Sequence, residues 1–247
     1  MDHTEFSDPR LVALYDTLNP LSADTTFYLE AAARLRASTI VDVGCGTGLL
    51  TCDLAKRGYT MIGVEPERAM LAVARLRPGA QQVQWIEGSA SRLGPLNADL
   101  AIMTGHVAQF FLTDSDWMDA LGSIRSALRP GGYLMFESRN PLARRWTRWT
   151  PALSRQEITT ETSGRIAVWT EHLGSEGNQV RYAMHFLFDD SGDELVSTGT
   201  LIFRSQEEIT RSLTDAGFAV QETYGDWSGG PIDATCPELI FVAARAQ

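Results

Sequence analysis

The stretch from Ile40 to Met70, IVDVGCGTGLLTCDLAKRGYTMIGVEPERAM, constrains the fold of this chain more than any other. Its first apolar run predicts a buried strand, three glycines follow, and a helical pattern begins directly after them. A second apolar run then ends in Glu65. A strand, a glycine-rich turn, a helix and a second strand form a βαβ unit, the building block of a parallel sheet.

The same alternation continues on both sides of this unit and predicts an α/β fold with a mainly parallel sheet. Helical patterns broken at NPLSAD precede it, over residues 9–36. Predicted strands lie at 39–44, 59–65, 83–90, 98–105 and 133–138, and predicted helices at 49–58, 67–79 and 114–130.

The rhythm changes after residue 141. Three strand-like runs, joined by the turn-rich connectors GSEGNQ and DDSGDE, predict a small antiparallel sheet inserted into the parallel one. These runs are 165–173, 180–188 and 195–203. We therefore expect a core formed by 1–140 and 205–247 and an inserted β segment at 141–204.

Two further elements are predicted at the end of the chain. SQEE at 205–208 is a possible capping box for a last helix that ends at Gly217. FAVQETYG and PELIFVAA follow as two strands of a terminal hairpin, so the last strand should run antiparallel to its neighbours.

Composition excludes several classes of protein. The hydrophobic fraction of 44% fits a globular chain, yet no apolar run approaches the roughly 20 residues that span a bilayer. The start, MDHTEFSDPR, is unlike a signal peptide. Cys45, Cys52 and Cys236 show no metal-type spacing, and their odd number argues against a disulfide framework. We expect a cytoplasmic protein with no metal site and no membrane association. The net charge of −10 makes a nucleic-acid partner unfavourable.

The glycine pattern narrows the ligand. Gly44, Gly46 and Gly48 form G-x-G-x-G, whereas the dinucleotide fingerprint G-x-G-x-x-G would require glycine where Leu49 stands. Glu65, at the end of the next strand, can accept both hydroxyls of a ribose. The pattern predicts a ligand with a ribose that need not contain a pyrophosphate.

At this point a family resemblance is clear. VDVGCGTGLL, GVEPERAML and LRPGGYLMFE resemble motifs of the class I S-adenosylmethionine-dependent methyltransferases. Asp42 and the three glycines match the E/D-x-G-x-G-x-G motif, and the resemblance covers nearly the whole chain apart from the inserted strands. It implies a Rossmann-like, seven-stranded, mostly parallel sheet with helices on both faces, and S-adenosylmethionine as cofactor.

The resemblance also implies cofactor contacts. The glycine loop would lie against the methionine part, Glu65 would bind the ribose, and Met70 would pack on the adenine. The segment 87–90 would line the adenine edge, although many relatives have Asp where this chain has Ser89. The expected cofactor-binding residues are Asp42, Gly44, Cys45, Gly46, Gly48, Glu65, Pro66, Met70, Gly88, Ser89, Ala90, Thr104 and Gly105. A tight turn without a ligand is the alternative for the glycines, and core packing for Met70.

The methyl acceptor should lie beside MTGHVAQFF, residues 103–111. His106 is either a general base, because histidine titrates near neutral pH, or a residue that orients this loop. Candidate substrate-binding residues are Tyr15, Gln109, Phe110, Arg139, Trp169 and Trp227. For each of these, ordinary packing in a helix, loop or sheet is the alternative.

Two further patterns bear on the acceptor. Period-two alternation places Tyr182, Met184, Phe186 and Phe188 on one strand face, which is either an acceptor pocket or sheet core. The arginines of 139–148, which surround Trp146, indicate an anionic acceptor or a solvated surface helix.

The favoured hypothesis is a cytoplasmic class I methyltransferase that transfers a methyl group to a small molecule by direct displacement. A nicotinamide-dependent oxidoreductase is opposed by Leu49. A nucleic-acid methyltransferase is opposed by the net charge and by TGHV, which stands where base-methylating relatives have an NPPY-type sequence. A protein that binds S-adenosylmethionine without catalysis is the third alternative.

Overall fold

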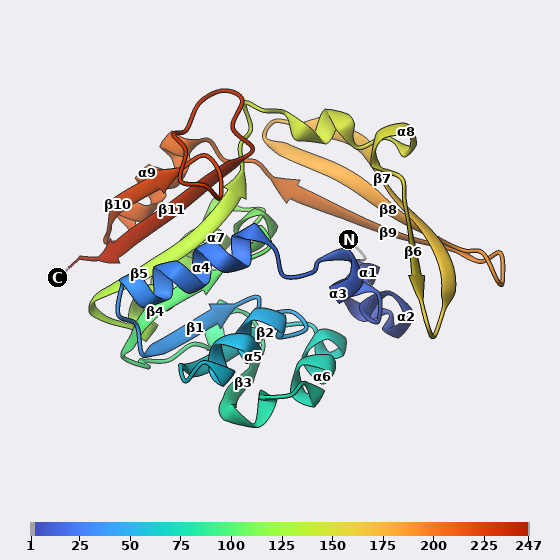
Figure 1. Ribbon diagram of the computed structural model, residues 1–247. Coiled ribbons are helices and arrows are strands. Elements are labelled where there is room, and N and C mark those ends of the chain that lie inside the picture. The colour runs from blue at the N-terminus through green and yellow to red at the C-terminus, as the bar shows by residue number, and fades with distance from the viewer. Residues whose placement is uncertain (1–2, 247) are drawn as a thin grey trace.

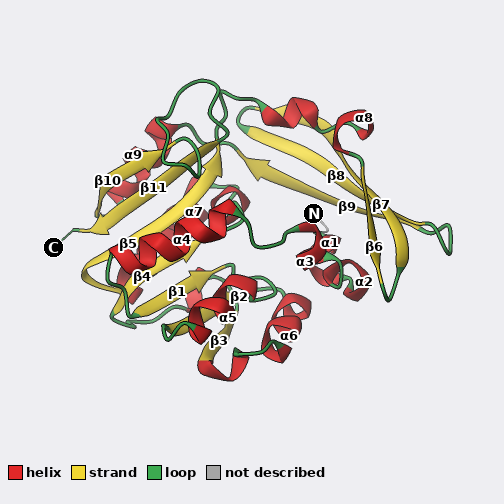
Figure 2. Cartoon of the chain, in the orientation of Figure 1, coloured by secondary structure: helices red, strands yellow, loops and turns green. Residues whose placement is uncertain are grey.

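A computed structural model describes residues 3–246 of the chain as two sheets with flanking helices (Figures 1 and 2). The larger sheet has seven strands in the order β10-β11-β5-β4-β1-β2-β3. Its strands are β1 Thr39–Val43, β2 Thr60–Glu65, β3 Val83–Glu87, β4 Ala98–Met103, β5 Leu128–Arg139, β10 Phe218–Tyr224 and β11 Glu238–Arg245. Pairing is parallel from β5 to β3, whereas β11 is antiparallel to both β5 and β10. The predicted α/β fold, with its antiparallel last strand, is confirmed.

Helices cover both faces of this sheet because its strands are apolar on both sides. One face packs on α7 (Asp114–Ala127) and α9 (Gln206–Asp215). The other packs on α4 (Ala23–Arg34) and α5 (Leu49–Lys56). The alternation within β1 shows the division, since Val41 belongs to the first core and Ile40 to the second.

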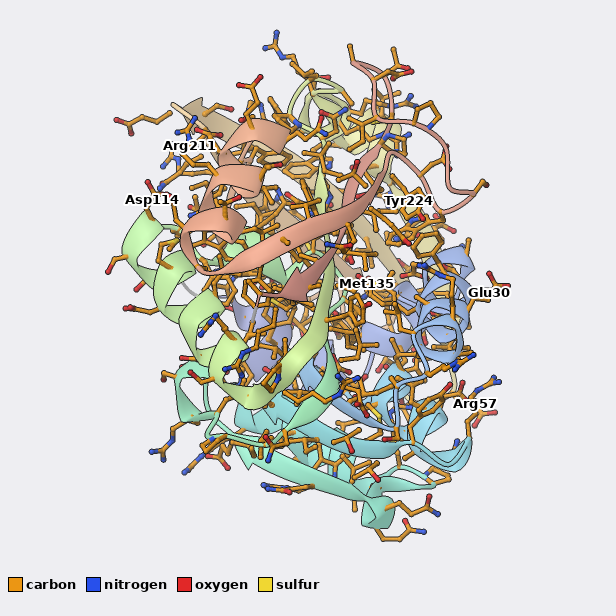
Figure 3. The ribbon with its side chains drawn as sticks, turned by 90° about the vertical axis from the view of Figure 1, so that its left-hand side faces the viewer. Glu30, Arg57, Asp114, Met135, Arg211 and Tyr224 are labelled. Carbon is orange, nitrogen blue, oxygen red and sulfur yellow. The ribbon has the colours of Figure 1, made fainter. Side chains whose placement is uncertain are left out.

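The side chains of these layers divide between the buried core and the surface. Met135 lies fully buried in the middle of the sheet, whereas Glu30, Arg57, Asp114 and Arg211 point outward (Figure 3). The remaining elements of the larger layer are short: α6 Arg68–Leu76, η1 Ala80–Gln82, η2 Ala90–Arg92 and η3 Val107–Phe110. No helix within residues 3–246 is both long and apolar enough to cross a membrane.

The inserted sheet has four antiparallel strands, one more than the sequence predicted. They are β6 Gln156–Thr160, β7 Gly164–Glu176, β8 Gln179–Phe188 and β9 Glu194–Ile202, preceded by η4 Arg145–Arg148 and α8 Pro151–Ser154. The additional strand is β6, whose sequence QEITT has no apolar run. It is an edge strand fixed by its pairing with β7, and a local pattern does not record such a pairing.

Three short helices at the beginning of the chain lie between the two sheets (Figure 1). They are α1 Thr4–Ser7, α2 Pro9–Val12 and α3 Tyr15–Leu18, and we call residues 3–19 the N-terminal segment. Hydrogen bonds connect it to both sides: the backbone N–H of His3 donates to the carbonyl of Thr198 in β9, and Asp16 accepts from Thr47 in the glycine loop.

Two helix ends test the predicted boundaries. The capping box at Ser205 and Glu208 is present and begins α9 as predicted. The helix expected to continue to Pro130 ends at Ala127 instead, and Leu128 already pairs with Ala98 as the first residue of β5. Proline restricts the residue before it to extended conformations, so the chain leaves the helix early.

Candidate active site

The glycine loop connects β1 to α5 in a conformation that favours glycine. Gly44, Gly46 and Gly48 have φ angles of 75°, 56° and 71°, in the left-handed region. A Cβ atom on Gly44 would lie 2.5 Å from Cγ2 of Val107. The loop backbone therefore approaches the segment after β4 as closely as it can.

Glu65, the last residue of β2, is fixed against this loop. Its Oε2 accepts the backbone N–H of Gly46 at 2.8 Å, and its Oε1 accepts that of Glu67 at 2.9 Å. Burial raises the pKa of Glu65, and the two backbone N–H donors act in the opposite direction. Each carboxylate oxygen has a second lone pair, so the group still can accept hydrogen bonds from a ligand.

A cavity of about 310 Å³, here called the glycine-loop cavity, opens beside these groups. The turns after β1, β2, β3 and β4 form most of its wall, and the N-terminal segment closes it with Phe6 and Tyr15. The expected cofactor-binding residues that line it are Gly44, Gly46, Glu65, Pro66, Met70, Gly88, Ser89, Ala90, Thr104 and Gly105.

The other three expected cofactor residues do not line the cavity. Asp42 is buried beneath it, where Oδ2 accepts the hydroxyl of Thr51 at 2.6 Å and Oδ1 has no partner. Burial raises the pKa of Asp42 to about 7. Gly48 precedes the first residue of α5, and the Cys45 sulfur lies against Gly63 of β2. Asp42 therefore supports the loop from below, whereas Cys45 and Gly48 are part of the loop itself.

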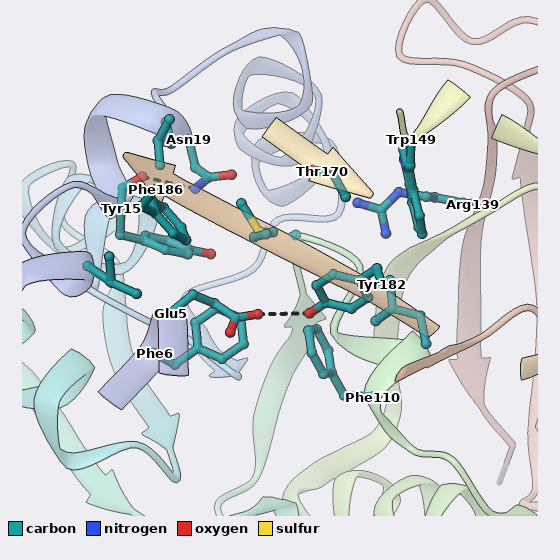
Figure 4. Close-up of a pocket in the computed structure, with 15 residues that line it drawn as sticks. Glu5, Phe6, Tyr15, Asn19, Phe110, Arg139, Trp149, Thr170, Tyr182 and Phe186 are labelled. Carbon is teal, nitrogen blue, oxygen red and sulfur yellow. Dashed lines mark hydrogen bonds between the residues drawn. The ribbon is translucent and has the colours of Figure 1, made fainter. Parts of the chain in front are cut away.

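A second cavity, of about 230 Å³, lies between the N-terminal segment and the inserted sheet, and we call it the insertion cavity (Figure 4). Its wall includes Tyr182, Met184 and Phe186 from the predicted aromatic face of β8. Four residues line both cavities: Phe6, Tyr15, Gly105 and Phe110. The two cavities therefore adjoin across a shared wall.

Glu5 is the anionic group of the insertion cavity. Oε1 accepts the hydroxyl of Tyr182 at 2.8 Å, and Oε2 accepts the hydroxyl of Ser197 (Figure 4 shows the first). Burial by itself would raise the pKa of Glu5, but hydrogen bonds from His3, Ser197 and Tyr182 outweigh it and lower the pKa. Glu5 is therefore ionised and well satisfied at neutral pH.

Two phenols of this cavity are weak acids that do not ionise at neutral pH. Burial, assisted by nearby carboxylates, raises the pKa of Tyr15 to about 12. Burial and Glu5 raise that of Tyr182 further. Both hydroxyls stay protonated at neutral pH and act as hydrogen-bond donors.

His106 points away from both cavities. Its Nε2 lies 2.8 Å from Oε2 of Glu238, at the start of β11, and its backbone N–H donates to Oε1 of Glu137 at 2.7 Å. Oε2 of Glu137 in turn accepts the hydroxyl of Tyr28. Burial, with a contribution from Arg139, lowers the pKa of His106 to about 3. With its left-handed φ of 64°, His106 connects the turn after β4 to β5 and β11.

Gln109 and Arg139 form a connected pair. Gln109 is fully buried and does not line either cavity; its Nε2 donates to the carbonyl of Ile202 at 3.0 Å. Its Oε1 accepts Nη1 of Arg139 at 2.9 Å. Arg139 itself lines the insertion cavity.

Neither tryptophan proposed for substrate binding lines a cavity. Trp169 pairs with His185 in the β7–β8 ladder and stacks on its ring, with centroids 4.8 Å apart. Thr170, which pairs with Met184, is the residue of β7 that faces the insertion cavity. Trp227 packs on Phe27 of α4.

Sequence inspection missed several lining residues, above all those of α1. Glu5 and Phe6 belong to a helix of four residues with no amphipathic repeat. The carboxylate of Glu5 is buried by contacts with strands almost 200 positions later in the chain, and no local signal indicates this.

Comparisons with known proteins agree with this geometry. A methyltransferase-domain family model matches residues 40–132. A putative methyltransferase of Geobacillus sp. (strain WCH70), GWCH70_2453, is 27% identical over 88% of each chain. The CcbJ methyltransferase of Streptomyces caelestis superimposes with a TM-score of 0.74 at 20% identity, covering 91% of this chain and 89% of that one. The S-adenosylmethionine-bound amino pentose methyltransferase CalS10 of Micromonospora echinaspora gives 0.72 at 24% identity, covering 94% and 97%.

A seven-stranded sheet, a left-handed glycine loop and an acid that ends the second strand are features of a Rossmann-like fold. The chain carries a methyltransferase domain at residues 40–132 and is similar to S-adenosylmethionine-dependent methyltransferases. S-adenosylmethionine is the ligand bound by CalS10, whose fold this chain shares.

Proposed function

We propose that this methyltransferase acts on a small-molecule acceptor bound in the insertion cavity, which the segment 141–204 covers. The observation that carries the proposal is the wall that the two cavities share. An acceptor in one cavity lies next to a cofactor in the other, and the limited volume of about 230 Å³ suits a small molecule. The fold is also that of an amino pentose methyltransferase, which supports this class of acceptor.

The residues of the glycine-loop cavity suit S-adenosylmethionine. Glu65 would accept the ribose hydroxyls with its remaining lone pairs, and Met70, on α6, would contact the adenine. A side chain on Gly46 would point toward Met70 and Tyr15, so glycine keeps that part of the cavity open. Asp42 would support the loop that contacts the methionine portion.

When bound, the cofactor supplies a methyl group activated by a sulfonium, so the chain has to align the acceptor and keep water away. Phe6, Tyr15 and Phe110 surround the junction of the cavities and restrict the access of water to it. Gly105 adds no side chain to that wall and leaves space between the two ligands.

For His106 we propose the orienting role and not that of a general base. Its imidazole contacts Glu238 and lines neither cavity, and burial keeps it neutral. His106→Asn retains a residue that tolerates a left-handed φ. We expect kcat to fall by less than the roughly 10²–10⁴-fold that a general base contributes, with an unchanged pH profile. Loss of a pKa from the kcat profile would instead show that His106 transfers the proton.

The first test is calorimetric titration with S-adenosylhomocysteine, with NADH as the control ligand. Wild type should bind only the former. Glu65→Ala should weaken this binding by roughly 1.5–3 kcal/mol, because it removes a charged hydrogen-bond acceptor. Glu30→Ala, on the exposed face of α4, is the matched control and should bind as wild type does. Preference for NADH would refute the cofactor assignment.

The second test identifies the acceptor class. The full chain is incubated with methyl-labelled S-adenosylmethionine and a cell extract, which is then separated into small molecules, nucleic acid and protein. Label in the small-molecule fraction is the expected result. Label in nucleic acid would favour a nucleic-acid methyltransferase. Binding of S-adenosylhomocysteine without transfer to any fraction would indicate a non-catalytic binding protein. We also propose a cytoplasmic location, supported by three cysteines that are all free thiols.

A further inference from the structure

The guanidinium of Arg139, the last residue of β5, lies in the insertion cavity and makes few hydrogen bonds with the protein. Figure 4 shows it pointing into the cavity beside Thr170 and Trp149. Among residues 3–246 its side chain makes one hydrogen bond, from Nη1 to Gln109. A guanidinium has five N–H donors, so most of them remain available to a ligand.

The charge of Arg139 also lacks a direct partner. No carboxylate in the described part of the chain lies within 4.0 Å of its guanidinium. Glu137 and Glu238 lie near enough to affect its pKa, but both are engaged with His106. Burial raises the pKa of Glu238 to about 7 and that of Glu137 as well, which reduces the negative charge they offer.

Glu5, the other charged group of the cavity, forms no ion pair with Arg139. Glu5 already accepts hydroxyl donors from Tyr182 and Ser197, one on each oxygen. The cavity thus holds one satisfied anion and one unsatisfied cation. A partly buried cation without a partner is costly, and a ligand that supplies the opposite charge removes that cost.

The surroundings of Arg139 indicate the rest of the ligand. Its guanidinium carbon lies 5.9 Å from the centre of the Trp149 ring, which holds one face of the group. Met184, Phe186 and Leu201 form an apolar wall beside it. An oxyanion can therefore approach the free edge of the guanidinium while an apolar body fills the remaining space.

We infer that the methyl acceptor carries a carboxylate that pairs with Arg139, while another atom of the same molecule receives the methyl group. This rests on the proposed function and names its substrate class. A carboxylate fits better than a phosphate, because a single guanidinium matches one negative charge, and Glu5 would repel a phosphate dianion about twice as strongly as a carboxylate.

The test follows the charge of the methylated product. Labelled small-molecule product is applied to an anion exchanger at pH 7 and again at pH 2.5. A carboxylate product is retained only at pH 7, because protonation neutralises it at the lower pH. Retention at both values would indicate a phosphate, and no retention a neutral or cationic product; either result overturns the inference. A neutral product that releases its label in alkali would show that the carboxylate itself is methylated, and also overturns it.

Variants then test the residue. For the acceptor that wild type methylates, Arg139→Gln should raise KM by roughly tenfold or more, with a smaller change in kcat. Arg139→Lys should lie between, because an ammonium keeps the charge but loses the planar geometry. Arg148→Gln, exposed on η4, is the control and should behave as wild type does. An unchanged KM in Arg139→Gln would overturn the assignment.

Binding separates the two levels of failure. All three variants should bind S-adenosylhomocysteine as wild type does, because Arg139 does not line the glycine-loop cavity. If wild type binds no S-adenosylhomocysteine, the proposed function fails. A second pair of ligands tests the carboxylate inference: 3-phenylpropanoate, which carries a carboxylate on an apolar body, and its neutral amide, 3-phenylpropanamide. If wild type binds S-adenosylhomocysteine but binds the carboxylate no more tightly than the amide, only the carboxylate inference fails.

Discussion

The two cavities are neighbours, yet the chain forms them in different ways. The turns that follow β1, β2, β3 and β4 form most of the glycine-loop cavity. The insertion cavity is assembled from α1, α3, β5 and three strands of the inserted sheet. One is a consequence of the fold, whereas the other depends on contacts between distant segments.

Each cavity contains a buried carboxylate, and the comparison is clearest there. The backbone N–H groups of Gly46 and Glu67 donate to Glu65, while side-chain hydroxyls donate to Glu5. Backbone donors persist under most substitutions, whereas hydroxyl donors are lost with a single change. We therefore expect the glycine-loop cavity to respond to changes in backbone conformation and the insertion cavity to changes in side chains.

The largest expected effect concerns the glycine loop. Gly44 and Gly105 have similar left-handed φ angles, 75° and 72°, but only at Gly44 would a Cβ meet another atom within 4 Å. Gly44→Ala should lower the free energy of unfolding by about 2–5 kcal/mol, the sum of φ strain and overpacking. Gly105→Ala should cost only the strain, about 1–2 kcal/mol. Denaturant titration measures both, and equal losses would contradict a rigid contact with Val107.

The insertion cavity should respond to a single hydroxyl. Tyr182→Phe removes a donor from the ionised Glu5 and should lower the free energy of unfolding by about 1.5–3 kcal/mol. Affinity for S-adenosylhomocysteine should stay within about twofold, because Tyr182 does not line the other cavity. Tyr133→Phe is the control at a partly buried tyrosine of the larger sheet. A parallel loss of ligand affinity in Tyr182→Phe would show that the two cavities are not separable.

The pH dependence of stability should reveal the carboxyl beneath the glycine loop. Burial raises the pKa of Asp42 to about 7, from about 4 in the unfolded chain. Its contribution to stability is fully present below about pH 4 and is lost as pH rises through about 7. Glu238 acts in the same direction, whereas His106, with its lowered pKa, acts oppositely below about pH 6.5.

We therefore expect the free energy of unfolding to fall, on the order of 1–2 kcal/mol, between pH 5.5 and 8. Asp42→Asn cannot ionise and should have a flatter dependence. Thermal or denaturant unfolding across this range provides the measurement. The same slope in both proteins would mean that another group controls it.

The smallest effect should come from the connection between the N-terminal segment and the glycine loop. Asp16 accepts hydrogen bonds from Arg77 and Thr47 at a partly exposed site. Exposed ion pairs contribute about 0.2–1 kcal/mol, so Asp16→Asn should speed the dissociation of S-adenosylhomocysteine by roughly 1.5- to 5-fold. Asp53→Asn removes a surface pair within α5 and should leave the rate unchanged. Stopped-flow measurements can resolve the difference, and a wild-type rate in Asp16→Asn would exclude a role for this contact.

The contrast between the cavities also explains what the sequence could predict. The parallel strands, the glycine turn and Glu65 follow from short patterns, because each turn directly follows its strand. The face of β7 that lines the insertion cavity could not be predicted in this way. Period two separates Trp169 from Thr170, but the pairing of β7 with β8, and the position of the whole sheet, decide which of them faces inward.

The directions of single side chains also could not be predicted from the sequence. His106 stands in the expected loop, yet its left-handed backbone directs the imidazole to Glu238, which lies 132 positions later. The helix α1 is fixed by partners far away in the sequence, and β6 is fixed by its pairing with β7. Local patterns predicted the elements that hold the site, and long-range hydrogen bonds determined the directions of its side chains.

The wall formed by Phe6, Tyr15, Gly105 and Phe110 has a thermodynamic consequence. A ligand that orders this wall from one side changes the free energy of binding on the other. The coupling is reciprocal: the factor by which the cofactor strengthens acceptor binding equals the factor by which the acceptor strengthens cofactor binding. With the acceptor in the proposed insertion cavity, both products would contact these four residues, so the departure of the first should weaken the binding of the second.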